Sequence, residues 1–501
     1  MDSPLATRIF RRLFRHQYCQ AAKASCRPSI LSPSSSRTHR RSISNGSHQS
    51  HADPAGRESH WQQRTDILPE DKSEEYRRYP MVTADQLRSR RERPKRVKML
   101  VRDFIDDSLY NPSYGYFSKQ AVIFTPGAPF AFNEMRDEPA FHAELSSRYT
   151  AFEDALDAKT PSDTRQLWHT PTELFRPHYG EAIARYLVSN YKLSLYPYHD
   201  LIIYELGAGN GTLMLNILDY IRDTDPSVYA RTQFRIIEIS HALASIQSST
   251  LTTNARSRGH LDKVQIINRS IFDWDTYVPS PCFFLALEVF DNFAHDSIRY
   301  DPTTGQPLQG SVLIDSAGDF YEFYSATLDP LAAHYLRARA TAVTMPYPHP
   351  VYSTPAIFRF LRSCLPFTPN LSTPEFIPTR LLQFFEILAA YFPAHRLVSS
   401  DFHSLPDAIA GINAPVVQTR YQRRTVPVST PFVEQGYFDI LFPTPFTQIE
   451  PLYRAVTGKL TRVLSQEDFL RRWALVHDTE TRSGENPMLS WYRNASVLTT
   501  L

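Results

Sequence analysis

The stretch from Leu201 to Ile221 constrains the fold of this chain more than any other part of the sequence. It begins as a short apolar run, Leu201–Leu206, which is typical of a buried strand in a parallel sheet. Glycines follow at Gly207, Gly209 and Gly211, and apolar residues then recur at helical spacing along the rest of the stretch. The order strand, glycine turn, helix predicts the first unit of a nucleotide-binding α/β fold, because glycines let the backbone turn tightly beside a ligand.

Two details of this stretch indicate which ligand it binds. Thr212 occupies the position at which a dinucleotide-binding fingerprint has its third glycine. Glu205 ends the strand two residues before the first glycine, where a carboxylate would repel a pyrophosphate and attract a cation. S-adenosylmethionine carries an ammonium and a sulfonium group, so the sequence predicts this cofactor, held by Glu205, Gly207, Gly209, Gly211 and Thr212. The alternative interpretation is an ordinary glycine turn that contacts no ligand.

Three further strands are predicted after the glycine helix, at Phe234–Glu238, Val264–Asn268 and Cys282–Leu287. Glu238 ends the first of them, in the position that bonds ribose hydroxyls in a doubly wound sheet; the alternative is a solvent-facing strand end. The last strand leads into the acidic turn Glu288–Asp291. These acids at strand ends predict ligand binding at the carboxyl edge of a doubly wound, Rossmann-like α/β sheet with helices on both faces.

The remaining organisation is predicted from composition and turn signals. Residues 96–195 are expected to form an N-terminal region of helices and a lid, and residues 196–501 the cofactor-binding domain. Small insertions, including a hairpin, are expected near 297–380. Later in this domain we expect an apolar helix over Leu381–Phe392 and a strand over Arg396–Ser400.

The net charge of +2 hides a strongly basic leader. Residues 1–50 hold nine Lys/Arg and one acid, which leaves 45 of the 54 basic and 51 of the 52 acidic residues in the rest of the chain. The body of the protein is therefore mildly acidic, and nothing indicates a nucleic-acid surface. The four cysteines include no CxxC pair, so the sequence predicts neither a disulfide framework nor a metal site.

Residues 1–50 have the composition of a mitochondrial transit peptide. They are rich in Arg and Ser, and Leu5, Ile9 and Leu13 recur at helical spacing among arginines. We expect them to direct the protein to the mitochondrial matrix; the alternative is a disordered basic tail. Residues 51–95 are expected to form a polar linker. No apolar run approaches the ~18–20 residues that span a membrane, so no spanning segment is predicted.

Four motif blocks occur in a distinctive order, and an acidic turn follows them. The blocks are Phe104–Phe117, Thr170–Glu181, Tyr204–Leu213 and Ile237–Leu251, and the turn is Glu288–Asp291. In these residues the chain resembles the mitochondrial protein arginine methyltransferases that assist assembly of respiratory complex I, the complex I assembly factor 7 family, and their bacterial relatives. It resembles a divergent member, because Leu287 stands where the family's Asn-Glu-Phe-Phe-Asp-Ala-Leu-Pro box has Asn, and Ala-Leu-Pro is absent.

The resemblance implies a class I S-adenosylmethionine-dependent methyltransferase whose substrate is a protein, such as a subunit of respiratory complex I. Tyr116, in the aromatic turn of the first block, is expected to cover the cofactor; the alternative is an aromatic turn in the core. We also assign Ser270, which follows the third predicted strand, to the cofactor-binding residues.

Methylation of arginine is an attack by a guanidinium nitrogen on a sulfonium methyl group, and positioning and electrostatics dominate its catalysis. A guanidinium is held best by carboxylates in a forked geometry, so Glu288 and Asp291 are the candidate catalytic residues. The alternative for each acid is that it caps the following helix.

Two functions therefore remain open. The first is a mitochondrial methyltransferase acting on protein arginine, which the intact set of Glu205, glycines and Glu238 favours. The second is a catalytically weak relative that acts as a binding or assembly factor, which Leu287 and the missing Ala-Leu-Pro favour.

Overall fold

The computed structural model describes residues 60–62, 70–119, 121–250, 259–302, 304–343, 355, 357–358 and 371–501. The predicted transit peptide lies outside these residues, as does part of the predicted linker. The described part of that linker contains two short helices, α3 (Ser73–Arg78) and α4 (Ala84–Leu87). Within the described ranges, no helix combines the length and the apolar character that a membrane crossing requires.

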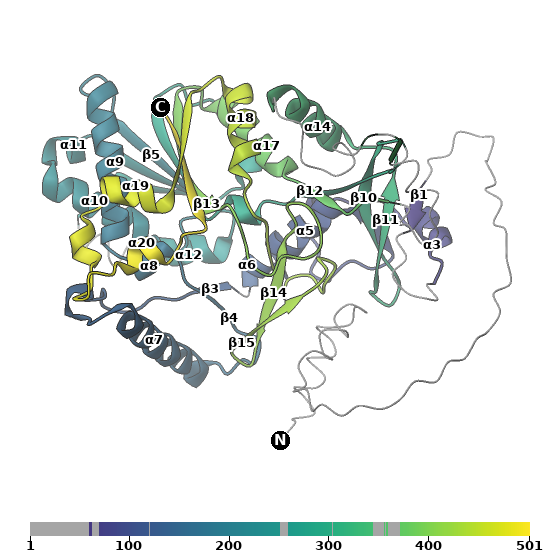
Figure 1. Ribbon diagram of the computed structural model, residues 1–501, viewed down its shortest axis with the longest axis horizontal. Coiled ribbons are helices and arrows are strands. Elements are labelled where there is room, and N and C mark those ends of the chain that lie inside the picture. Colours follow the sequence, from purple (N-terminus) through teal and green to yellow (C-terminus); the bar gives the residue numbers. More distant parts are fainter. Residues whose placement is uncertain are drawn as a thin grey trace.

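A seven-stranded sheet, of which β5 and β13 are labelled in Figure 1, forms the centre of the fold. Its strand order is β17-β18-β13-β8-β5-β6-β7. The five strands from β13 to β7 are parallel, and β18 runs antiparallel to both of its neighbours. The chain winds outward from β5 in both directions, so the predicted doubly wound, Rossmann-like α/β sheet is confirmed. The strands are β5 (Leu201–Leu206), β6 (Thr232–Ile237), β7 (Val264–Ile267), β8 (Cys282–Leu287), β13 (His395–Phe402), β17 (Thr461–Ser465) and β18 (Ala495–Thr500).

Helices cover both faces of this sheet, because successive side chains of a strand point to opposite faces. Ile203 of β5 packs into a cluster with α9 (His178–Ser194), α10 (Thr212–Thr224) and α19 (Gln466–Trp473). Ile202 and Tyr204 pack on the other face with α17 (Thr379–Tyr391) and α18 (Phe446–Thr457). All six residues of β5 are buried, as its continuous apolar run predicts.

The predicted strands and helices of this domain lie within two residues of their observed bounds, whereas the edge strand β17 and its neighbour β18 were not predicted. Both strands are short and carry Ser and Thr at several positions, so their hydrophobic pattern is weak.

A second, antiparallel sheet is built around the predicted hairpin. Its strands are β1 (His60–Gln62), β11 (Phe320–Ser325), β10 (Pro307–Ile314), β9 (Asp296–Tyr300) and β12 (Glu375–Ile377), with β2 (Val97–Leu100) also paired to β10. The helix α5 (Val101–Tyr110) begins directly after β2. The pairing of β2 with β10 ties the N-terminal region to the hairpin.

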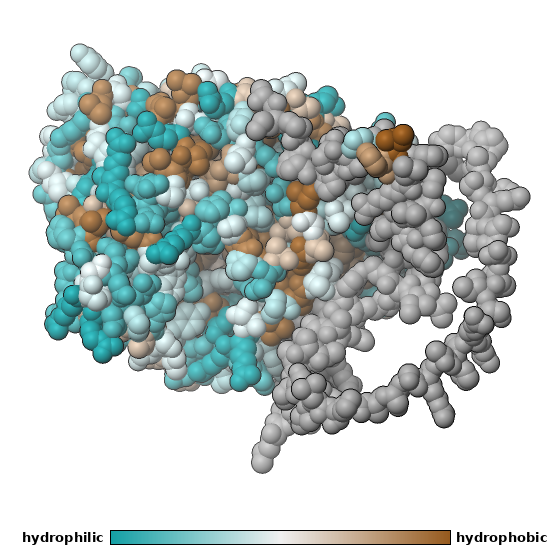
Figure 2. All heavy atoms as spheres, viewed as in Figure 1, coloured by the Kyte–Doolittle hydropathy of each residue, from teal (hydrophilic) through white to brown (hydrophobic). Residues whose placement is uncertain are grey.

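Two smaller sheets and several helices complete the described part of the fold. Three strands, β14 (Val416–Tyr421), β15 (Arg424–Val428) and β16 (Asp439–Leu441), form a small sheet, and β3 (Ala121–Ile123) pairs with β4 (Gln166–Trp168). The other α-helices are α6 (Tyr116–Lys119), α7 (Glu138–Lys159), α8 (Pro171–Leu174), α11 (Pro226–Ala230), α12 (His241–Thr250), α14 (Pro330–Ala342) and α20 (Pro487–Ser490). Hydrophilic residues cover most of the face seen in Figure 2, with hydrophobic residues in small groups among them.

Candidate active site

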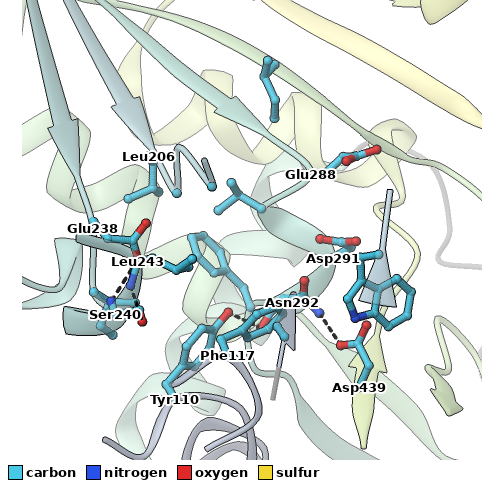
Figure 3. A pocket seen from close by; sticks show the side chains of 18 of the residues that line it. Tyr110, Phe117, Leu206, Glu238, Ser240, Leu243, Glu288, Asp291, Asn292 and Asp439 are labelled. Atoms are coloured by element: carbon cyan, nitrogen blue, oxygen red, sulfur yellow. Dashed lines mark hydrogen bonds between the residues drawn. The ribbon is translucent and has the colours of Figure 1, made fainter. Parts of the chain in front are cut away.

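A cavity of about 1120 Å³ opens at the carboxyl edge of the central sheet. The strand order reverses between β5 and β8, and this switch point is where doubly wound sheets bind ligands. The ends of both strands line the cavity, together with residues of α5, α6, α12 and β16. Figure 3 shows Glu238 and Ser240 at one end of this cavity and Asp291 and Asp439 at the other.

The glycine turn after β5 forms one wall of the cavity. Gly207, Gly209 and Gly211 have φ angles of 68°, 52° and 78°, a left-handed conformation that glycine adopts without strain. Gly207 and Gly209 line the cavity, whereas Gly211 is the N-cap of α10 and does not. A Cβ built on Gly209 would lie 2.7 Å from Cδ1 of Ile123, which itself lines the cavity. The turn therefore brings bare backbone to the cavity.

Glu205, the penultimate residue of β5, lies in the wall of the cavity with 5% of its surface exposed. No donor among the described residues lies within hydrogen-bonding distance of its Oε2 atom. Burial, and then the charge of Glu238, raise the pKa of Glu205 to about 8. A buried carboxylate without a partner is costly unless a cation joins it, so Glu205 fits the ammonium group of S-adenosylmethionine.

Glu238, directly after β6, belongs to a hydrogen-bonded network that includes the glycine turn. Its Oε1 accepts from the backbone N–H of Ser240 at 2.9 Å, and its Oε2 accepts from Nε2 of Gln247 at 3.0 Å. The same Nε2 donates to the carbonyl of Gly209 at 3.0 Å. Burial raises the pKa of Glu238. The network fixes the position of Glu238, which was predicted to bind ribose hydroxyls. The alternative, a strand end that faces solvent, does not fit, because Glu238 is only 3% exposed.

Thr212 reaches a residue that no sequence pattern singled out for the site. Its hydroxyl donates to Oε1 of Glu173 at 2.7 Å, and Nδ2 of Asn210 donates to the same oxygen at 3.1 Å. Glu173 lies in α8, whose N-cap Thr170 accepts a hydrogen bond from the backbone N–H of Glu173. The spacing Thr-Pro-x-Glu at this cap was a visible signal of an ordered helix start, but nothing in it indicated a contact with the glycine turn.

The acidic turn after β8 is held by a carboxylate from the neighbouring strand. Oδ2 of Asp401, in β13, accepts hydrogen bonds from the backbone N–H groups of Val289, Phe290 and Asp291 at 3.2, 2.8 and 3.3 Å. Glu288 has a φ of 53°, which a residue with a side chain rarely adopts, and its N–H donates to the carbonyl of Ser400 at 2.8 Å. The backbone of the turn is therefore fixed by β13, and neither Glu288 nor Asp291 has to cap it.

Asp291 lies within the single-turn helix η5 (Phe290–Asn292) and is 2% exposed. No donor in the described part of the chain reaches its Oδ1 atom. Burial, followed by the charges of Asp401, Glu288 and Asp439, raises the pKa of Asp291 well above its usual value.

Two further carboxylic acids of this end of the cavity have raised pKa values. Burial and the charge of Asp401 raise the pKa of Glu288 to about 8. Burial raises the pKa of Asp439, on β16, to about 7, and its Oδ1 accepts from Nδ2 of Asn292 at 3.1 Å. Close carboxylates that resist ionisation form a site that a cation would stabilise.

Aromatic side chains line the same cavity. Tyr110 and Phe117 stack with their ring centroids 5.6 Å apart, and the Tyr110 hydroxyl donates to the carbonyl of Asn292 at 3.1 Å. Tyr116 does not line the cavity; it is fully buried in the core beside Trp168, whose Nε1 donates to its hydroxyl. The structure thus places Tyr116 in an aromatic turn of the core, which was the alternative interpretation. Tyr110 and Phe117 line the cavity, where Tyr116 was expected.

The predicted residue Ser270 lines the cavity at the N-cap of η4 (Ile271–Asp273), where its hydroxyl accepts from the N–H of Phe272 at 3.2 Å. Tyr179 and Tyr492 line the cavity beside Glu288, and the charge of Glu288, after burial, raises the pKa of both hydroxyls. The Tyr492 hydroxyl is buried and has no hydrogen-bond partner among the described residues. No group of three His, Cys, Asp or Glu in the described ranges is arranged to hold a metal ion.

The donors and acceptors of the cavity fit S-adenosylmethionine. The bare backbone at Gly207 and Gly209, the unpartnered Oε2 of Glu205 and the fixed carboxylate of Glu238 would hold it. When bound, the cofactor supplies an electrophilic methyl group on its sulfonium.

Comparisons with known proteins indicate the family of this chain. Residues 182–464 match the family model described as "Putative S-adenosyl-L-methionine-dependent methyltransferase". The chain is 26% identical over 389 residues, 76% of its length and 80% of the relative's, to "Protein arginine methyltransferase NDUFAF7 homolog, mitochondrial" of Schizosaccharomyces pombe. The structure is similar to a "likely methyl transferase" of Burkholderia thailandensis bound to S-adenosyl-homocysteine, with a TM-score of 0.49, 15% identity, and coverage of 81% of this chain and 88% of that one.

Proposed function

This chain belongs to the S-adenosyl-L-methionine-dependent methyltransferase family whose model it matches, and we propose that it methylates arginine side chains of proteins in the mitochondrion. The observation that carries this proposal is the group of carboxylic acids at the end of the cavity opposite Glu238. Glu288, Asp291 and Asp439 are buried or half-buried there with raised pKa values. A guanidinium is always charged and donates five hydrogen bonds, so it is the protein side chain best suited to this environment.

Each acid has a role that follows from its surroundings. Glu288 and Asp291, on one short turn fixed by Asp401, would grip the guanidinium and aim one nitrogen toward the cofactor end. The attacking nitrogen must lose a proton, and Glu288, whose pKa is raised to about 8, is a suitable acceptor. The walls formed by Tyr110 and Phe117 exclude water and strengthen these interactions.

The proposal is tested in two steps. Titration calorimetry should first give the affinity of the purified protein for S-adenosylmethionine. The protein is then incubated with mitochondrial extract and radiolabelled S-adenosylmethionine, and the labelled proteins are hydrolysed and analysed for methylarginine. Label in methylarginine is the expected result. Label confined to lysine, histidine or small molecules would overturn the arginine assignment while leaving the methyltransferase family unaffected.

The proposed location and partner rest on different observations. The relative from Schizosaccharomyces pombe is named mitochondrial, and residues 1–50 separate arginine from acid almost completely. We expect these residues to carry a fluorescent reporter into the mitochondrial matrix; a cytosolic or secreted reporter would contradict this. The resemblance of the four motif blocks favours a subunit of respiratory complex I as the methylated protein, which the labelled band in the extract would identify by mass spectrometry.

A second candidate function is a catalytically weak assembly factor that keeps the cofactor. Leu287 favours this function. It ends β8 in the wall of the cavity, and the family's Asn-Glu-Phe-Phe-Asp-Ala-Leu-Pro box has Asn at this position. An assembly factor of this kind would bind S-adenosylmethionine in the calorimeter, transfer no methyl group to the extract, and still co-purify with its partner.

A further inference from the structure

The segment that joins α4 to β2 is the most basic part of the described chain. Residues 88–96 read Arg-Ser-Arg-Arg-Glu-Arg-Pro-Lys-Arg. Apart from Arg93, which is half-buried, all of its basic side chains are exposed. We call this segment the cationic ledge. It stands out because the chain beyond residue 50 carries more acidic than basic residues.

The ledge is anchored to the body of the protein. Nε of Arg93 donates to the carbonyl of Gln435 at 2.7 Å, and its guanidinium lies 4.7 Å from the ring centroid of Tyr437. Pro94 is buried, and Nζ of Lys95 donates to the carbonyl of Ala317 at 3.1 Å. A charged surface held in place in this way loses little conformational entropy when a partner binds.

Most of the charge on the ledge is not neutralised. No acidic side chain of the described residues lies within ion-pair distance of Arg90, Arg91 or Arg96. The acid within the ledge, Glu92, is exposed as well. These three arginines are therefore available to an acidic partner.

The ledge begins at the mouth of the cavity. Arg88 lines the cavity and forms ion pairs with Asp85 at 2.8 Å and with Asp273, on η4, at 2.9 Å. Both acids of these pairs are exposed, in contrast to the buried acids Glu205 and Asp291. Arg88, which lines the cavity and is neutralised, is therefore followed along the chain by exposed arginines that form no ion pair with the described residues.

We propose, building on the proposed function, that the cationic ledge binds acidic residues that flank the target arginine of the substrate protein. The interior selects a cation, and the ledge next to the mouth repels a basic segment and attracts an acidic one, so the favoured substrate is an arginine in an acidic sequence. A nucleic acid or an anionic lipid would be attracted by the ledge but not by the cavity, because the carboxylates of the cavity repel phosphates.

The experiment compares two fluorescent peptides that differ only in their flanks. Each carries one arginine, with Asp/Glu on both sides in the first and Ser/Ala in the second. Their binding is measured by fluorescence anisotropy in the presence of S-adenosyl-homocysteine, and their methylation by radiolabel transfer. The variant is Arg90→Ala with Arg91→Ala. The matched control is Arg471→Ala with Arg472→Ala, a second exposed pair of arginines, on α19, which does not line the cavity.

The wild-type protein should bind the acidic peptide at least about fivefold more tightly, with the preference shrinking as salt is raised. Exposed ion pairs are individually weak, so the ledge variant should weaken binding about three- to tenfold and raise KM similarly, with kcat unchanged. The control variant should bind like the wild type. Equal affinity for both peptides, or a ledge variant that weakens only the binding of cardiolipin-containing vesicles or RNA, would overturn the ledge proposal. Flank-dependent binding without any methyl transfer would instead count against the proposed function alone.

Discussion

The two ends of the cavity both present buried carboxylates, but the chain builds them in different ways. At the cofactor end, Glu205 and Glu238 come from adjacent strands within one continuous stretch of sequence, and Gln247 of the next helix links Glu238 to the glycine turn. At the opposite end, which we call the substrate end after the proposed function, Asp291 lies in the turn after β8 and Asp401 lies in β13, and a long insertion separates these two strands in the sequence. A short motif can specify the first end, whereas the second depends on the packing of distant elements.

The largest effect is expected for Gly209→Val at the cofactor end. At a φ of 52° a β-branched side chain is strained, and its Cβ would lie 2.7 Å from Cδ1 of Ile123. Cδ1 is the end of a flexible side chain and Ile123 can move aside, so the strain at the positive φ is what forces the turn to shift. We expect affinity for S-adenosylmethionine to fall at least ~100-fold by calorimetry, with an unchanged circular dichroism spectrum.

Gly458→Val is the matched control for this change. Gly458 caps α18 with a φ of 68°, and a Cβ built on it would meet nothing within 4 Å, so the variant adds the same kind of backbone strain away from the cavity. A loss of thermal stability with normal cofactor affinity is expected. If both variants bind the cofactor normally, the glycine turn is not part of the cofactor site.

Glu288→Gln tests the substrate end separately. The change is nearly isosteric and removes one charge from the turn. Because hydrogen bonds to charged groups are about twice as strong as neutral ones, we expect methyl transfer to fall at least ~100-fold. Calorimetry should show an unchanged affinity for S-adenosylmethionine. A variant that loses thermal stability, with activity that follows the folded fraction, would give Glu288 a structural role instead.

Much of the fold could be predicted from the sequence, because the strands of the central sheet are continuous apolar runs next to turn signals. Cys282–Leu287 was predicted with its observed bounds. β18 was missed, since its residues Ala495–Thr500 include Ser and Thr and gain their burial only from the neighbouring strands. The six-stranded second sheet could not be predicted beyond its hairpin, because β2 joins it from a distant part of the chain.

The candidate site was predictable to the extent that it is local. Glu205 and Glu238 were found because each ends a strand, and both line the cavity. Tyr116 was expected in the cavity because it lies in an aromatic turn, but sequence spacing does not say which ring of such a turn faces inward. Asp401 directly follows the predicted strand Arg396–Ser400, yet nothing local showed that it accepts three hydrogen bonds from the turn of Asp291.

Asp401→Asn should have an intermediate effect at the substrate end. An amide oxygen can still accept from the turn, but without the charge that strengthens these bonds, so kcat should fall about tenfold. Cofactor affinity should not change. The pH dependence of kcat/KM distinguishes a positioning role of Asp401 from general destabilisation. Burial and the charge of Asp401 raise the pKa of Glu288 to about 8. Asp291, Tyr179 and Tyr492 also face the Glu288 carboxyl.

The sign of the pH effect follows from that neighbouring charge. If ionised Glu288 is required, kcat/KM of the wild type rises with pH up to about 8. In Asp401→Asn the repulsion is gone, the pKa of Glu288 falls, and the acid limb of kcat/KM moves to lower pH. An acid limb that stays in place while kcat falls would mean that Asp401 acts only on the stability of the turn.

Gln247→Leu should produce the smallest effect, and it tests whether the cofactor end depends on its internal network. The variant removes the hydrogen bonds from Nε2 to the carbonyl of Gly209 and to Oε2 of Glu238. The side chain is 1% exposed and leucine has a similar volume, so packing is largely kept. Glu238 retains the bond from Ser240, and the lost bonds lie within the protein rather than to the cofactor, so only part of their about 1 kcal/mol each affects binding and the affinity for S-adenosylmethionine should fall about two- to fivefold. Gln265→Leu, at an exposed position of β7, is the control and should change nothing. If Gln247→Leu also binds the cofactor like the wild type, Glu205 and the bare glycine backbone suffice to hold it. The cofactor end is then specified by the short stretch around the glycine turn, without help from α12.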